Sequence, residues 1–119
     1  MNANEQYLRN LIIMARADGQ LQYPEKALLE QIRAELGASQ EELKMALSAF
    51  GNPCIRFEVF ERFSVKVRNF EDLVAIALAD GQLGGNERVL LIEAAMGIGL
   101  SQEQSNQIIA SVAKMLQGD

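Results

Sequence analysis

The pentapeptide Ala-Asp-Gly-Gln-Leu occurs twice in this chain, at Ala17–Leu21 and at Ala79–Leu83. Each copy is followed at the same distance by a glutamate, Glu25 in the first and Glu87 in the second. The offset is 62 residues, and the similarity continues without a gap through Leu11 and Leu73, Ala15 and Ala77, Leu28 and Leu90, Leu29 and Leu91, Gly37 and Gly99, and Ser39–Glu41 and Ser101–Glu103. An ungapped internal repeat predicts two copies of one supersecondary unit.

The length of 119 residues suits one domain with a shared core. A chain of this size buries about two thirds of the surface that it exposes when unfolded. We therefore expect residues 1–119 to form a single domain, with a first repeat at about 8–47 and a second at about 70–109.

Apolar residues recur at helical spacing almost throughout, which predicts an all-α fold. Capping signals place the helix ends. Pro24 suits an early helical position, Gly37 a C-terminal stop, and Ser39 with Glu42 forms a capping box. In the second repeat, Gly99 and Ser101 with Gln104 give the same signals. We expect about seven helices, at about Asn4–Ala17, Pro24–Leu36, from Ser39 onward, Pro53–Val67, Phe70–Ala79, Asn86–Met96 and Ser101–Leu116.

Composition excludes several classes of function. The chain has no histidine, which removes Ser-His-Asp and Cys-His catalysis and most zinc sites. The net charge of −5 argues against a nucleic-acid partner, because neutralising phosphates requires clustered Lys and Arg. Paired carboxylates serve glycoside hydrolysis, but there is no tryptophan to hold a sugar. We expect a protein that is not an enzyme.

Cysteine content and the distribution of apolar residues predict a cytoplasmic protein. The single cysteine, Cys54, forms no internal disulfide, as is usual in a reducing compartment. No apolar run approaches the roughly 18 residues of a membrane span, and Met1–Asn10 lacks the features of a secretory signal.

The repeated loops have two interpretations. In the structural one, Asp18 and Asp80 accept hydrogen bonds from loop amides, and Glu25 and Glu87 interact with helix N-termini. In the functional one, Asp18 faces Glu25 and Asp80 faces Glu87, and pseudosymmetry gathers all four carboxylates at one end of the molecule. Four carboxylates suit a hard divalent cation such as calcium, magnesium or manganese. An EF-hand is excluded, because the twelfth position of such a loop is Leu29.

The motif Ala-Asp-Gly-x-Leu-x-x-x-Glu, present twice between apolar helices, resembles the TerB-like family, which is named for bacterial tellurite resistance. A similar domain stands at the front of a membrane-anchored DnaJ-type co-chaperone. The resemblance covers about Leu8 to Leu116. It implies an all-helical domain with internal two-fold pseudosymmetry, a role in stress responses, and metal binding by the motif residues Asp18, Gly19, Glu25, Asp80, Gly81 and Glu87.

The chain departs from that family at one loop position. Gln22 and Gly84 stand where many members carry another acid, which weakens the expected cation affinity. Two functions therefore remain open. The first is a TerB-like domain that binds a divalent cation, and the second is a protein-interaction module whose acidic loops are only structural.

A locally basic, aromatic segment lies between the repeats. Ile55–Arg68 carries four cationic residues and the phenylalanines Phe57, Phe60 and Phe63. The simpler interpretation is an amphipathic core helix with a solvated charged face. The alternative is a docking face for an acidic partner or a homodimer. That alternative predicts Arg62 and Lys66 exposed beside an uncovered phenylalanine.

Overall fold

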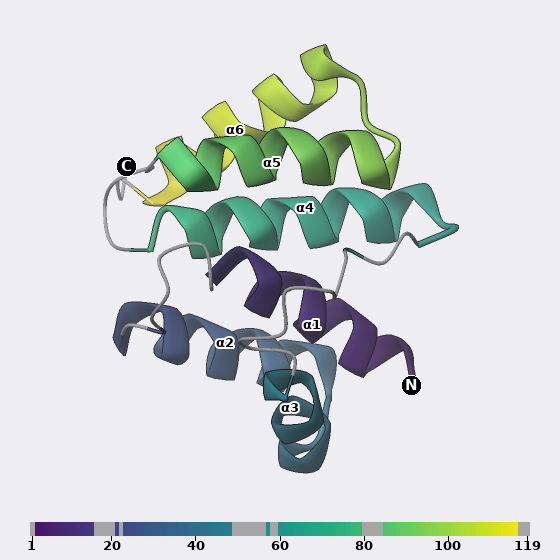
Figure 1. Ribbon diagram of the computed structural model, residues 1–119, viewed down its shortest axis with the longest axis vertical. Helices are drawn as coiled ribbons and strands as arrows, with labels where there is room; N and C mark the ends of the chain where they lie inside the picture. Colours follow the sequence, from purple (N-terminus) through teal and green to yellow (C-terminus); the bar gives the residue numbers. More distant parts are fainter. Residues whose placement is uncertain are drawn as a thin grey trace.

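The computed structural model describes residues 2–15, 21, 23–48, 57, 60–79 and 85–116 (Figure 1). This part of the chain is all-helical and contains no strand. Its six helices are α1 (Ala3–Ala15), α2 (Tyr23–Leu36), α3 (Gln40–Leu47), α4 (Phe63–Ala77), α5 (Gly85–Ile98) and α6 (Gln102–Leu116). The predicted all-α class is confirmed.

The helices form one globule around α1 and α4. These two helices pack against each other at the centre, α1 also contacts α2 and α3, and α4 also contacts α5 and α6 (Figure 1). Contacts of α2 with α4 and of α5 with α1 tie the two halves together. The Cα radius of gyration is 13.1 Å, in keeping with a compact domain of this length.

Local signals fix the helix ends as predicted. The Ser39 hydroxyl accepts a hydrogen bond from the Glu42 amide at 3.0 Å, and the Glu42 carboxylate accepts one from the Ser39 amide at 2.8 Å. Ser101 and Gln104 make the same reciprocal pair at 3.1 and 2.9 Å. Gly37 and Gly99 end α2 and α5 with φ of 72° and 93°, in the left-handed region that suits glycine.

Apolar side chains from all six helices fill the core. The largest buried ones are Leu8, Leu11, Ile12, Met14, Leu29, Phe70, Leu73, Val74, Ile76, Leu91 and Ile98. Burying a Leu, Ile or Phe side chain stabilises the fold by roughly 1.5–3 kcal/mol. On α1, Leu8, Leu11, Ile12 and Ala15 form a buried face. On α2, Leu28 and Leu29 pack toward the core and Ala27 is exposed.

The segment around Asn69 corrects a prediction. We expected one helix to end near Val67 and another to start near Phe70, but α4 runs unbroken through both. Asn69 does not cap a helix, because its side chain is buried and bonds to α1. The predicted helix Pro53–Val67 is wrong at Phe57 and Phe60–Arg62, which are not helical, and correct at Phe63–Val67, which form the start of α4.

Candidate functional site

The predicted acidic site falls only partly within the described structure. Asp18 and Asp80, with Gly19 and Gly81, lie outside the described residues. Glu25 lies in the first turn of α2 and is 2% exposed. Glu87 occupies the same third position in α5, where the structure describes the backbone but not the side chain.

Within the described part of the chain, no three Asp, Glu or Cys residues are grouped so as to hold a metal ion. Two of the four predicted ligands lie outside that part, so the approach of Asp18 to Glu25 and of Asp80 to Glu87 stays a prediction.

Four polar side chains cross the buried interface between α1 and α4. The Tyr7 hydroxyl donates to the Asp72 carboxylate at 2.5 Å, and the Asn10 amide donates to Asn69 Oδ1 at 2.7 Å. Asn10 and Asn69 are fully buried, as is most of Tyr7. Buried polar groups are costly unless they are paired, so this network fixes how α1 and α4 align.

Burial sets the electrostatics of the network. Burial raises the pKa of the Asp72 carboxyl, against the opposing effects of the Tyr7 hydrogen bond and the Arg68 charge. Burial also raises the pKa of the Tyr7 phenol, with the Asp72 charge adding to the effect. Arg68 lies 5.9 Å from the centre of the Tyr7 ring. The network holds α1 and α4 together, and we assign it a structural role.

A hydrogen-bonded polar cluster lies on the outer side of the first repeat. It consists of Glu30, Arg33, Gln40 and the Ala38 carbonyl, and we call it the clasp. Arg33 donates to Glu30 at 2.7 Å and to the Ala38 carbonyl at 2.7 Å, and Gln40 donates to Glu30 at 2.9 Å. The hydrogen bonds from Arg33 and Gln40 lower the pKa of Glu30. The clasp joins the outer face of α2 to the start of α3.

The equivalent positions in the second repeat are apolar. At the offset of 62 residues, Ile92 replaces Glu30 and Ala95 replaces Arg33. With neither charge present, no clasp can form, although Gln102 and Leu100 stand at the remaining two positions. The outer side of α5 therefore carries an apolar side chain, Ile92, where α2 carries Glu30.

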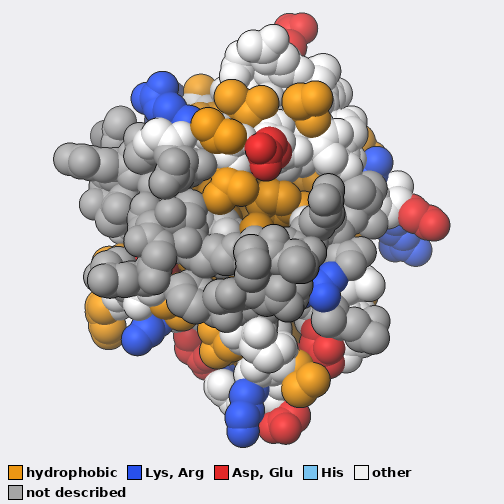
Figure 2. Space-filling model, in the orientation of Figure 1, with side chains coloured by type: hydrophobic (Ala, Val, Ile, Leu, Met, Phe, Trp, Pro, Cys, Tyr) orange, Lys and Arg blue, Asp and Glu red, His pale blue; other side chains and the backbone are white. Residues whose placement is uncertain are grey.

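The exposed side of α5 forms a hydrophobic surface. Val89, Ile92 and Met96 are 55%, 62% and 74% exposed, and their spacing of three and four residues puts them on one face. We call these three residues the α5 outer face. Figure 2 shows hydrophobic side chains gathered over α5, with an acidic side chain among them. An exposed apolar row of this kind is a candidate interaction surface.

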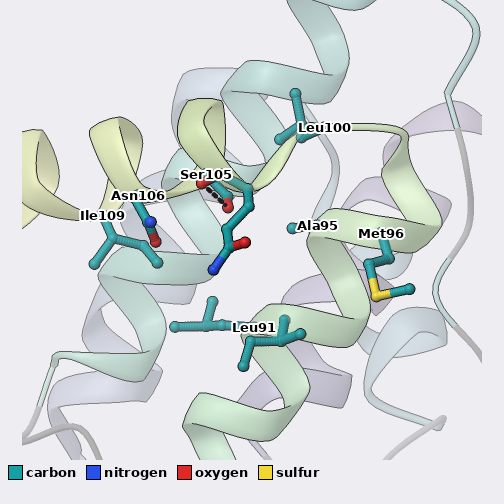
Figure 3. A pocket seen from close by; sticks show the side chains of 9 residues that line it. Leu91, Ala95, Met96, Leu100, Ser105, Asn106 and Ile109 are labelled. Carbon is teal, nitrogen blue, oxygen red and sulfur yellow. Dashed lines mark hydrogen bonds between the residues drawn. The ribbon is translucent and has the colours of Figure 1, made fainter.

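A groove opens beside this face, between α5 and α6. Its volume is about 430 Å³, and no charged residue lines it. Figure 3 shows Leu91 and Ala95 on α5 and Ser105, Asn106 and Ile109 on α6. The Ser105 hydroxyl donates to the Gln102 carbonyl at 2.9 Å, which leaves the groove mostly apolar. The groove lies where the clasp lies in the first repeat.

The basic, aromatic segment is described only at Phe57 and Phe60–Arg68. Phe63 is 56% exposed, and Phe57 and Phe60 are half-buried. Arg62 is exposed as predicted, but Lys66 is half-buried. A Cβ placed on Gly99 would come within 3.3 Å of the Lys66 ammonium, so this charge lies at the C-terminal end of α5, where a cation is favoured. The prediction of two exposed cations is therefore met by Arg62 alone.

The α5 outer face was missed by the sequence analysis, although the signal was present. The run Val89–Ile98 has one charged residue, whereas its equivalent Ala27–Leu36 has three. Comparing the repeats position by position would have found it. None of the helices in the described ranges has the length and hydrophobicity needed to cross a membrane.

Comparison with protein-family models, with curated proteins and with solved structures gives no match to this chain.

Proposed function

We propose that this protein is a non-enzymatic interaction domain, built from two pseudo-symmetric TerB-like repeats, that binds a protein partner through the α5 outer face. The observation that carries the proposal is the exposure of Val89, Ile92 and Met96 in one row on the outer side of α5. Contiguous exposed apolar surface on a small domain marks an interaction site more often than not.

Matching geometry in the two halves supports the repeat. The bounds of α2 and α5 differ by 62 at both ends, as do the starts of α3 and α6. By the same offset, Tyr7 is equivalent to Asn69 and Asp72 is equivalent to Asn10. Tyr7 is hydrogen-bonded to Asp72, and Asn10 is hydrogen-bonded to Asn69. Reciprocal contacts of this kind are what a two-fold axis produces. A seventh helix would have to lie before Phe57, outside the described residues.

The comparison between repeats also supports the choice of α5. Exposed helix faces are normally polar, as the face of α2 is at Lys26, Glu30 and Gln31. Only the second repeat has lost the clasp and gained a hydrophobic surface with an adjoining groove. Since both repeats keep the same core and caps, this difference serves something other than folding.

Photo-crosslinking in cells tests this function. A photoreactive amino acid at Ile92 should give a discrete protein adduct, because Ile92 is the centre of the proposed surface. The matched control carries the same amino acid at Glu30, the equivalent position on α2, and should give none. Equal labelling at both positions, or none at Ile92, would contradict the proposal.

Cation binding is a second candidate, favoured by the two Ala-Asp-Gly-Gln-Leu loops, each with a glutamate at the same distance after it. In this reading Asp18 with Glu25, and Asp80 with Glu87, bind calcium, magnesium or manganese. The role in tellurite resistance or another stress response follows from the TerB resemblance alone.

A further inference from the structure

We propose that the partner of the α5 outer face is a second copy of this chain, with the two α5 helices parallel across a two-fold axis. This inference rests on the proposed function and makes it specific. It follows from the arrangement of charges beside the apolar residues of α5.

The outer face has the pattern of one heptad, about two turns, of a parallel coiled coil. Val89, Ile92 and Met96 occupy successive positions a, d and a of a heptad. In that frame Arg88 takes position g and Glu93 takes position e, and both side chains are exposed. Position g of one parallel helix faces the following position e of its partner, five residues further along. Arg88 of each copy would therefore face Glu93 of the other.

The charges also select the orientation. On the surface of α5, Arg88 and Glu93 stand on opposite flanks of the apolar row, since helical residues advance by about 100° each. A two-fold axis along parallel helices brings opposite flanks together and pairs Arg88 with Glu93. An antiparallel pair would instead bring each flank against itself, so that Arg88 would face Arg88 and Glu93 would face Glu93. Only the parallel arrangement is complementary in charge.

Self-complementarity favours a second copy over an unrelated protein. The same helix supplies the apolar row and both members of the ion pair. In a parallel dimer, the apolar rows of the two copies therefore cover each other, and each charge faces an opposite charge. The first repeat cannot offer this contact, because Lys26 and Gln31 stand in place of Arg88 and Glu93, around Ala27, Glu30 and Ala34. An interface of one short helix per copy is small, so the dimer should be weak and dependent on concentration.

Sedimentation equilibrium of the purified chain over a range of concentrations tests this. Wild type should show a reversible monomer–dimer equilibrium. Arg88→Glu and Glu93→Arg should each weaken dimerisation about tenfold, because each places two like-charged pairs across the axis. An equimolar mixture of the two variants should dimerise like wild type, since the mixed dimer regains two opposite-charge pairs. The double variant Arg88→Glu/Glu93→Arg should also regain it.

Matched variants on α2 separate this effect from a change in net charge. Lys26→Glu and Gln31→Arg lie at the equivalent positions and should leave the equilibrium unchanged. Circular dichroism confirms that each variant is folded. A wild type that stays monomeric, or variants whose mixture does not recover, would overturn the dimer. The docking function is tested separately by crosslinking at Ile92. An adduct with another protein would support the docking function and contradict the homodimer.

Discussion

Tyr7 and Asp72 are 65 residues apart in sequence, yet the Tyr7 hydroxyl donates a hydrogen bond to the Asp72 carboxylate between α1 and α4. A shift of 62 residues maps Tyr7 onto Asn69 and Asn10 onto Asp72, and Asn10 bonds to Asn69. The two bonds are thus equivalents of each other in the proposed repeat. Together they determine the alignment of the two central helices.

Replacing Asp72 with Asn should change how stability depends on pH. Because burial raises the pKa of Asp72 in the folded state, that state holds its proton more tightly than the unfolded chain does. This tighter proton binding stabilises the fold fully below the ordinary carboxyl pKa of about 4. The stabilisation is lost as the pH rises through the raised pKa of Asp72. Relative to wild type, Asp72→Asn should therefore gain stability as pH rises toward neutral.

Urea denaturation of both proteins from acid to neutral pH measures this difference. Ser64→Ala, at an exposed and uncharged position of the same helix, provides the control, and its stability difference from wild type should not vary with pH. A difference between Asp72→Asn and wild type that stays constant with pH would show that the carboxylate is not disfavoured by burial.

The Asn10–Asn69 pair should behave as one unit in a double-mutant cycle. Asn10→Leu or Asn69→Leu alone leaves a buried amide without its partner and should destabilise the protein by about 1–3 kcal/mol. The double variant replaces both amides with apolar groups of similar size, so its loss should be smaller than the sum of the two. Additive losses in chemical denaturation would mean that the bond does not couple the two helices.

The two capping serines should be equivalent in energy. Ser39→Ala and Ser101→Ala each remove a side-chain acceptor for a helix amide, and each should lower the free energy of unfolding by about 1 kcal/mol. Ser48→Ala is the control, because Ser48 follows the end of α3 and its hydroxyl donates to the Met45 carbonyl. A loss at only one of the two caps would argue against matched repeats.

Cation binding, if the repeated loops are ligands, should appear as thermal stabilisation. A ligand of the native state at 100 times its dissociation constant contributes about 2.7 kcal/mol. Calcium, magnesium or manganese should raise the melting temperature of wild type, and Asp18→Asn with Asp80→Asn should abolish that rise. If the aspartates are only structural, the double variant melts lower without metal, and no cation changes either protein.

Sequence alone predicted what local signals and periodicity determine. The fold class, the capping boxes at Ser39 and Ser101, and the glycine stops at Gly37 and Gly99 depend on neighbouring residues and were correct. Asn69 was misjudged, because a helix cap and a buried interhelical partner look alike in sequence. Only tertiary structure shows that Asn69 meets Asn10.

The candidate site was harder to predict for a related reason. The motifs drew attention to residues that the repeats share, whereas the α5 outer face arises where the repeats differ, with Val89, Ile92 and Met96 in place of Ala27, Glu30 and Ala34. Apolar residues at helical spacing indicate a core face, and the sequence could not show that Val89, Ile92 and Met96 are left exposed by the other described helices.

The most direct test of the docking face is a dilution series followed by backbone amide NMR of the uniformly labelled protein. We expect the amide chemical shifts of Arg88–Met96 to change with protein concentration. Those of the equivalent residues Lys26–Ala34 on α2 should stay constant. Ile92→Glu, which places the charge of the equivalent α2 position at the exposed centre of the α5 outer face, should remove these changes while the protein stays folded. Spectra that do not change with concentration, or changes centred on α2, would contradict the account.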